Sequence, residues 1–245
     1  MSLCKHCVSG SIHEGTPKGK VEQIDGHDVY VATPTKDYPK DKVLLMLTDV
    51  FGLQLNNNKL LADSYAENGI LTYMPDYLNR DPIDPEAMAS GKADLGAWFP
   101  NHGPEQTMPA LKATMDHLKS QGVKDFAAVG YCFGARYVFN LSYDNLIKVG
   151  AVNHPSLIQP EDIEKIGKTG IPILFNTCET DSQFPKEKQE LADKVLGGNP
   201  DLYKRNYWAG QTHGFAVRGD FSKPENKKAH DEAFKASYEW IASKL

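Results

Sequence analysis

The sequence predicts an α/β fold in which a mostly parallel central sheet is flanked by helices on both faces. Two observations favour this class. Short apolar runs, rich in β-branched residues, alternate along the chain with longer amphipathic segments, as in strand–helix units. Several of these runs, such as residues 43–47, are apolar without interruption, which is typical of strands that are covered on both faces.

The predicted strands are apolar runs bounded by turn-forming or polar residues. Pro75, Pro82 and Pro85 break the regular pattern after the third run, so residues 75–86 are predicted to form a surface loop. In chain order the predicted strands occupy residues 29–33, 43–47, 70–74, 125–130, 149–153, 171–177 and 202–208.

The amphipathic segments predict helices between the strands. In one of them Met108, Leu111, Met115 and Leu118 recur at helical spacing. We interpret these side chains as core packing rather than as a binding face, because methionine commonly fills gaps in a core. The predicted helices occupy residues 55–68, 85–98, 104–118, 133–143, 187–196 and 223–245.

Composition and charge narrow the class of protein. Of the 245 residues 40% are hydrophobic and 24% are charged, which predicts one domain over residues 1–245, with residues 1–20 a loosely tethered N-terminal segment. The net charge of −5 provides no cationic field for nucleic acid or an anionic membrane, so we expect neither partner. No apolar stretch approaches a membrane span and no secretion signal is recognisable, so a cytoplasmic protein is expected.

Cysteines stand at positions 4, 7, 132 and 178, too few for a disulfide framework in a chain of this length. Cys4 and Cys7 form a C-x-x-C pair, but only His6 and His13 lie near it in the sequence. A zinc site ordinarily draws on a second pair of ligands. We therefore predict free thiols and no metal site.

The most informative segment is GYCFG, residues 130–134, which lies between a predicted strand and a predicted helix. Glycines two residues before and two after a nucleophile let strand and helix approach closely around a strained turn. This is the nucleophile elbow of the α/β-hydrolase fold, with sulfur in place of the usual serine oxygen. The start of a helix also favours a thiolate, so Cys132 is the predicted nucleophile, and an inert buried cysteine is the alternative.

In this fold the acid and then the histidine follow the nucleophile along the chain. Asp181 and His213 each come shortly after a predicted strand, at the carboxyl ends where ligands of parallel sheets bind. They are the predicted acid and base, and Glu179 stays open as a rival acid. His154 also follows a strand but precedes the acid, so we predict that it is a substrate-binding residue in the pocket wall.

An oxyanion hole in this fold takes one backbone N–H group from the residue after the nucleophile and another from the loop after an early central strand. The first of these residues is Phe133. The loop is TDVFG, residues 48–52, in which Gly52 permits a sharp turn and Val50 is the predicted donor.

Together these residues resemble the dienelactone hydrolase family, and its eukaryotic branch in particular. The resemblance extends over nearly the whole chain and rests on Asp181 and on the segments DVFG (49–52), PD (75–76), GYCFG (130–134) and HGF (213–215). It implies hydrolysis of an unsaturated lactone by the cysteine, with no cofactor. The family also places an acid before the oxyanion donor, where it helps to ionise the thiol. Here that position is Asp49, one methylene shorter than the usual glutamate.

Bacterial relatives in that family hold the substrate carboxylate with arginines, one of them soon after the catalytic histidine. Arg218 lies one place later than that pattern, so it is either a displaced substrate-binding residue or a solvated surface residue. Tyr77, Trp98 and Phe99 are candidate apolar walls of the pocket, and a core role stays open for each of them.

The sequence thus predicts a hydrolase that cleaves small lactones or activated esters through an acyl-thioester on Cys132. Its partner is a small-molecule substrate, and the chain is a monomer or a homodimer. A general carboxylesterase or a hydrolase of secondary metabolism fits the same residues. The alternative from another class is a catalytically silent protein that binds a ligand or senses oxidation on a hydrolase scaffold.

Overall fold

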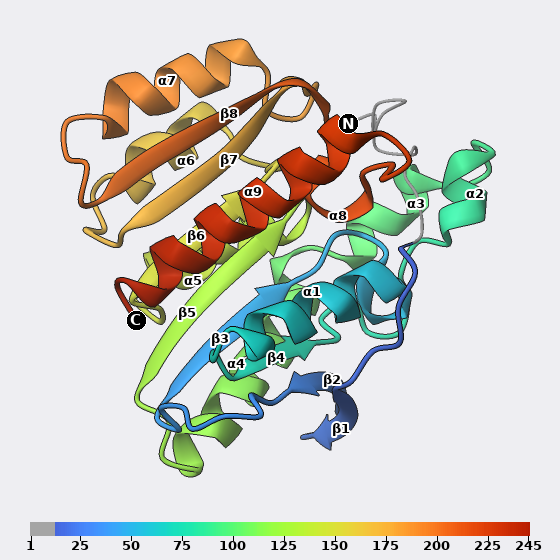
Figure 1. Cartoon of the computed structure of the whole chain (residues 1–245), viewed down its shortest axis with the longest axis vertical. Helices are drawn as coiled ribbons and strands as arrows, with labels where there is room; N and C mark the ends of the chain where they lie inside the picture. Colours follow the sequence, from blue (N-terminus) through green and yellow to red (C-terminus); the bar gives the residue numbers. More distant parts are fainter. Residues whose placement is uncertain (1–12) are drawn as a thin grey trace.

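The computed structural model describes residues 13–245, whose strands form one eight-stranded sheet with helices on both faces (Figure 1). The strand order is β1-β2-β4-β3-β5-β6-β7-β8. From β4 to β8 all neighbours in this order are parallel, whereas β1 and β2 pair antiparallel with each other and β2 pairs antiparallel with β4. The predicted mostly parallel sheet is confirmed.

The strands are β1 (Lys20–Ile24), β2 (His27–Ala32), β3 (Lys42–Leu47), β4 (Thr72–Pro75), β5 (Asp125–Tyr131), β6 (Val149–Asn153), β7 (Ile173–Thr180) and β8 (Tyr203–Thr212). The helices are α1 (Asn56–Glu67), α2 (Pro85–Ala89), α3 (Leu95–Trp98), α4 (Pro104–Ser120), α5 (Gly134–Tyr143), α6 (Pro160–Ile166), α7 (Lys186–Leu196), α8 (Phe215–Arg218) and α9 (Pro224–Ala242), with single 3-10 turns η2 (Gly52–Gln54) and η3 (Phe99–Asn101).

The central strands are buried almost from end to end. Every residue of β6 is buried, as is every residue of β3 and β5 after the first. In Figure 1, α1 and α9 lie in front of the sheet and α5 and α6 lie behind it. A strand covered on both faces has no solvated side, which is why these strands are continuous apolar runs in the sequence.

Among the described strands and α-helices, β1, α6 and α8 were not predicted from the sequence. β1 is exposed along most of its length and therefore lacks an apolar pattern, while α6 and α8 are too short to show a helical period. The single helix predicted over residues 85–98 is wrong. The chain instead forms α2 and α3, because it turns between them at Gly91, whose φ is +71°.

Residues 13–19 are tied to α1. The backbone N–H of His13 donates to the side chain of Asn57 at 2.8 Å, and the N–H groups of Lys18 and Gly19 donate to the carboxylate of Asp63 at 2.7 and 3.1 Å. The loose tether predicted for residues 1–20 is therefore wrong for this part, because polar side chains of α1 bind the extended backbone.

The C-x-x-C pair of Cys4 and Cys7 lies outside the described residues. Between residues 13 and 245, no group of three or more His, Cys, Asp or Glu side chains could hold a metal ion. In the same stretch, no helix combines the length and the apolar character that crossing a membrane requires.

Candidate active site

Cys132 lies in the turn between β5 and α5 with a φ of +52°, a left-handed conformation that costs a non-glycine residue about 1–3 kcal/mol. The flanking glycines make this turn possible. A Cβ atom on Gly130 would lie 2.6 Å from the carbonyl of Gly134, and a Cβ on Gly134 would lie 2.2 Å from the carbonyl oxygen of Leu47. Only glycine fits at either position, and α5 therefore begins directly against the end of β3.

The backbone of the elbow is joined to the turn that follows β6. The N–H of Cys132 donates to the carbonyl of Asn153 at 3.1 Å, and the carbonyl of Cys132 accepts from the N–H of Ser156 at 3.0 Å. Between these two residues the chain turns through His154, whose φ is +37°. Both backbone polar groups of Cys132 are thus satisfied by a single neighbouring turn.

The structure brings Asp181 and His213 together, as predicted. Nδ1 of His213 lies 2.9 Å from the Asp181 carboxylate. One oxygen of that carboxylate also accepts from the backbone N–H groups of Gln183 and Phe184, at 2.8 and 3.1 Å. The rival acid Glu179 is exposed, so Asp181 is the acid that contacts the histidine.

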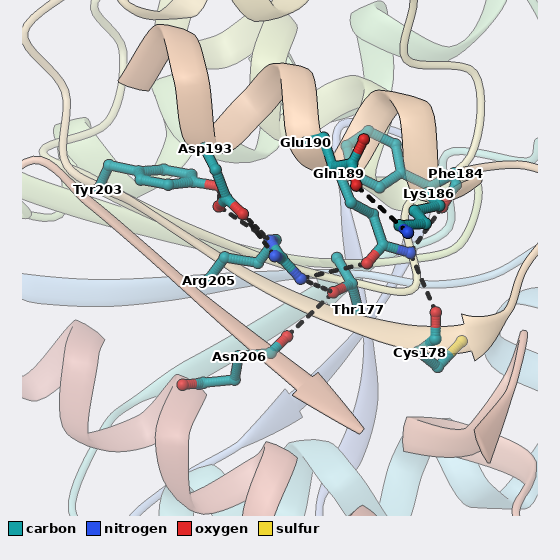
Figure 2. A network of polar contacts seen from close by, with 10 residues as sticks. All are labelled: Thr177, Cys178, Phe184, Lys186, Gln189, Glu190, Asp193, Tyr203, Arg205 and Asn206. Atoms are coloured by element: carbon teal, nitrogen blue, oxygen red, sulfur yellow. Dashed lines mark hydrogen bonds and ion pairs between the residues drawn. The ribbon is translucent and has the colours of Figure 1, made fainter. Parts of the chain in front are cut away.

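A further set of polar contacts holds the turn that carries Asp181 (Figure 2). The side-chain amide of Gln189, on α7, donates to the carbonyls of Cys178 and Phe184 at 3.0 and 3.1 Å. Arg205, on β8, donates to the side-chain oxygen of Gln189 at 3.1 Å and forms an ion pair with Asp193. The turn is therefore fixed at both of its ends by groups that no sequence motif marks.

Ser156 is a fourth side chain at this site, beside Cys132, Asp181 and His213, and the sequence reasoning missed it. Its Oγ lies 3.3 Å from Sγ of Cys132 and 3.5 Å from Nε2 of His213. The side chain is buried. The only available signal was a hydroxyl residue three positions after a strand, in the segment NHPS.

The charge state of His213 follows from its neighbours. Burial lowers the pKa of His213, but the negative charges of Asp181 and Cys132, with their hydrogen bonds, outweigh burial and raise the pKa to about 10. An imidazolium therefore stands between a carboxylate and a sulfur at neutral pH. A cation beside a thiol favours the thiolate, which is the nucleophilic form.

The two predicted oxyanion donors are Val50 and Phe133, and their role in an oxyanion hole stays a prediction. Within residues 13–245, neither the N–H of Val50 nor that of Phe133 donates a hydrogen bond, although both residues are buried. Undonated buried N–H groups are rare in folded proteins. Because Gly134 contacts the end of β3, the loop that carries Val50 begins beside the turn that carries Phe133.

Asp49 and Arg218 form a buried ion pair, with 3.1 Å between Oδ2 and Nε. The other oxygen of Asp49 accepts from the side chain of Asn58 and from the backbone N–H of Phe51. No hydrogen bond joins Asp49 to Cys132 in the described part of the chain, so the thiol-activating role of Asp49 stays a prediction. Arg218 is only 6% exposed, so the interpretation as a solvated surface residue is wrong.

His154 packs against His213, with 4.9 Å between the ring centroids. It is fully buried, and in residues 13–245 neither of its ring nitrogens has a hydrogen-bond partner. Burial, and then the positive charges of His213 and Arg218, lower the pKa of His154 well below its usual range. Contact between His154 and a substrate stays a prediction.

A mainly apolar cavity of about 470 Å³ lies beside the elbow. Phe133 and Leu157, the neighbours of Cys132 and Ser156 in the chain, line it together with Leu95 and Phe99. Phe99, which the sequence analysis named as a candidate wall of the substrate pocket, therefore lines this cavity.

The other two predicted wall residues, Tyr77 and Trp98, surround the side chain of Phe133. The ring of Tyr77 stacks on that of Phe133 with 6.0 Å between centroids, and the ring of Trp98 lies 5.4 Å from it. Their polar atoms donate to the backbone carbonyls of Thr48 and Asp81. Both rings are buried, which is the core role that the sequence analysis left open for them. They pack against Phe133, the residue that follows Cys132.

Comparison with known proteins identifies the family of this chain. The family model described as the dienelactone hydrolase family matches residues 27–245. Among curated proteins, hydrolase pyvD of Aspergillus violaceofuscus is 34% identical over 240 residues, which cover 96% of this chain and 94% of the relative. Dienlactone hydrolase 1 of Gibberella moniliformis is 30% identical, covering 98% and 92%, and the carboxymethylenebutenolidase homolog of Homo sapiens is 28% identical, covering 91% and 90%.

Solved structures share the fold at low sequence identity. A dienelactone hydrolase-like promiscuous phosphotriesterase from metagenomic libraries superposes with a TM-score of 0.67 at 17% identity, covering 93% of this chain and 98% of that one. A cold-adapted esterase from an Arctic intertidal metagenomic library gives 0.66 at 16% identity, covering 93% of each chain. The α/β-hydrolase fold is confirmed, and the match over residues 27–245 shows that this chain belongs to the dienelactone hydrolase family.

Proposed function

We propose that this chain hydrolyses small lactones or activated carboxylic esters through an acyl-thioester on Cys132. The observation that carries the proposal is an imidazole held between a carboxylate and the sulfur of a nucleophile elbow. The relatives named as hydrolases and dienelactone hydrolases support the same reaction class.

In the acylation step the thiolate of Cys132 attacks the carbonyl carbon, and the π electrons of the carbonyl move to its oxygen. The N–H groups of Val50 and Phe133 stabilise this oxyanion. As the intermediate collapses, the carbon–oxygen bond to the leaving group breaks. The leaving oxygen takes the Nε2 proton of His213, which becomes neutral.

In the deacylation step the neutral imidazole of His213 takes a proton from water, and the resulting hydroxide attacks the thioester. The carbon–sulfur bond then breaks and releases the carboxylic acid. Thiolate and imidazolium are restored together, so no net proton is gained or lost by the site. Asp181 stabilises the imidazolium and fixes the tautomer of the neutral ring.

The cavity beside the elbow indicates which part of the substrate the protein would enclose. Its lining is mainly apolar, and its cation, Arg136, forms an ion pair with Asp162 at 2.6 Å. A substrate carboxylate would have to compete with Asp162 for this arginine. An uncharged apolar group next to the scissile carbonyl therefore fits better than the carboxylate of a dienelactone.

The direct test is Cys132→Ala, assayed with p-nitrophenyl acetate. We expect kcat to fall by about four orders of magnitude or more, because no other group forms the acyl intermediate, while circular dichroism stays unchanged. Cys178→Ala is the matched control, since Cys178 is an equally buried cysteine. Because the contact of its Sγ with Oδ2 of Asp181 is long, at 3.9 Å, this variant should keep the acyl intermediate and lose at most about threefold in turnover, and its unfolding free energy should fall by about 1–2 kcal/mol. Full activity in Cys132→Ala would remove Cys132 from the mechanism.

Two assays of the wild-type protein distinguish an esterase from a redox sensor that is built on the same scaffold. An enzyme shows an initial burst of p-nitrophenol, equal to the concentration of Cys132, followed by steady turnover. A sensor shows oxidation of Cys132 by hydrogen peroxide and no turnover of any ester.

A further inference from the structure

The side chain of Ser156 contacts both reacting groups of the site. Its hydroxyl lies 3.3 Å from Sγ of Cys132 and 3.5 Å from Nε2 of His213, and in the described residues it has no other hydrogen-bond partner. A buried hydroxyl without a structural partner is unusual, because buried polar groups are nearly always paired. The two contacts of Ser156 are therefore with the nucleophile and the base alone.

The position of this hydroxyl is fixed by the backbone. The N–H of Ser156 donates to the carbonyl of Cys132, and the N–H of Cys132 donates to Asn153 at the end of β6. Positive φ angles at His154 and Leu157 turn the chain on either side of Ser156. Such conformations are strained in residues other than glycine, and they tend to cluster at functional sites.

We propose that Ser156 is a further catalytic residue, whose hydroxyl bridges His213 and Cys132 and stabilises the resting thiolate. This proposal rests on the proposed function. The Nε2–H group of the His213 imidazolium is shared between Sγ of Cys132 and Oγ of Ser156, and the hydroxyl proton of Ser156 is donated to Sγ. The bridge forms and breaks no covalent bond, and it leaves the hydroxyl proton on Ser156.

The hydroxyl of Ser156 supplies the sulfur of Cys132 with a hydrogen bond where water has little access. The Cys132 side chain is only 2% exposed and Ser156 only 3%, so water has little access to the sulfur. A charged acceptor that is shielded from water depends on hydrogen bonds from the protein. When the thiolate attacks a substrate its charge moves to the carbonyl oxygen, and the bond from Ser156 to sulfur is no longer required.

The test compares Ser156→Ala and Ser156→Thr with the wild-type protein. Iodoacetamide alkylation of Cys132 is followed against pH by mass spectrometry of the peptide that contains it, and ester hydrolysis is followed in parallel. In Ser156→Ala we expect the midpoint of the alkylation profile to move upward by about one pH unit, and the rate of the acylation burst and kcat/KM to fall about tenfold at pH 7. Ser156→Thr retains a hydroxyl and should recover most of both.

Ser142→Ala is the matched control, because Ser142 is also a buried serine but its hydroxyl donates within α5 to the carbonyl of Val138. It should leave the alkylation profile unchanged. An unchanged alkylation midpoint in folded Ser156→Ala, or equal loss in the alanine and threonine variants, would overturn the role of Ser156. Absence of ester turnover in the wild-type protein would instead count against the proposed function, and the alkylation profile would still decide on Ser156.

Discussion

The rings of His213 and His154 lie 4.9 Å apart and are equally buried, at 1% and 0% exposure, yet their environments favour opposite charge states. His213 has Asp181 on one ring nitrogen, and Ser156 and Cys132 near the other. His154 has no hydrogen-bond partner for either nitrogen among residues 13–245. The pair shows that burial beside other cations favours a neutral histidine, and that neighbouring negative charges reverse the effect.

Among the tests of this contrast between the two histidines, the largest loss of kcat/KM is expected when the surroundings of His213 are made to resemble those of His154. Asp181→Asn removes the negative charge that raises the pKa of His213, so the imidazolium is lost and the neutral ring can adopt the wrong tautomer. We expect kcat/KM for p-nitrophenyl acetate to fall about 10³- to 10⁴-fold. The measurement is steady-state kinetics at pH 7 with circular dichroism as a check on folding.

Glu179→Gln is the control for that substitution. Glu179 lies two residues before Asp181, but its carboxylate accepts from the backbone N–H of Gly210 instead of contacting the histidine. Its removal should change kcat/KM by no more than about twofold, since exposed polar substitutions have small effects. Equal losses in the two variants would mean that the acid has been misassigned.

The second prediction is that His213 and His154 lose their ring protons at widely different pH values in the wild-type protein. With isotopically labelled histidine, NMR should show the ring of His213 protonated at pH 7 and losing its proton near pH 10, because its pKa is raised to about 10. The ring of His154 should stay neutral down to a pH well below 6.5, because its pKa is lowered. His213→Gln and His154→Phe assign the signals, and similar midpoints for both rings would contradict the contrast.

Of the changes made to the two histidines and their neighbours, His154→Phe should have the smallest effect. The ring has no hydrogen bond to lose in the described structure and carries no charge, so an apolar ring of similar shape should alter kcat/KM by less than about threefold. A rise in KM with an unchanged kcat would instead place a ring nitrogen of His154 on the substrate, as the sequence analysis predicted.

Much of the fold could be read from the sequence because the central strands are buried on both faces. The runs that became β3, β5 and β6 are apolar without interruption, and each was located within about one residue of its observed bounds. β1 and α6 were missed because an exposed edge strand and a seven-residue helix have no such pattern. The break between α2 and α3 depended on a single glycine with positive φ.

The sequence by itself determined the elbow, since a cysteine flanked by Gly130 and Gly134 allows the close approach of strand and helix that the structure contains. It also determined the order of nucleophile, acid and histidine along the chain. Only the tertiary structure decided that Ser156 reaches the sulfur, that Arg218 pairs with Asp49, and that two neighbouring histidines differ in charge. These features depend on contacts between residues tens to more than a hundred positions apart, and local pattern carries no information about such distances.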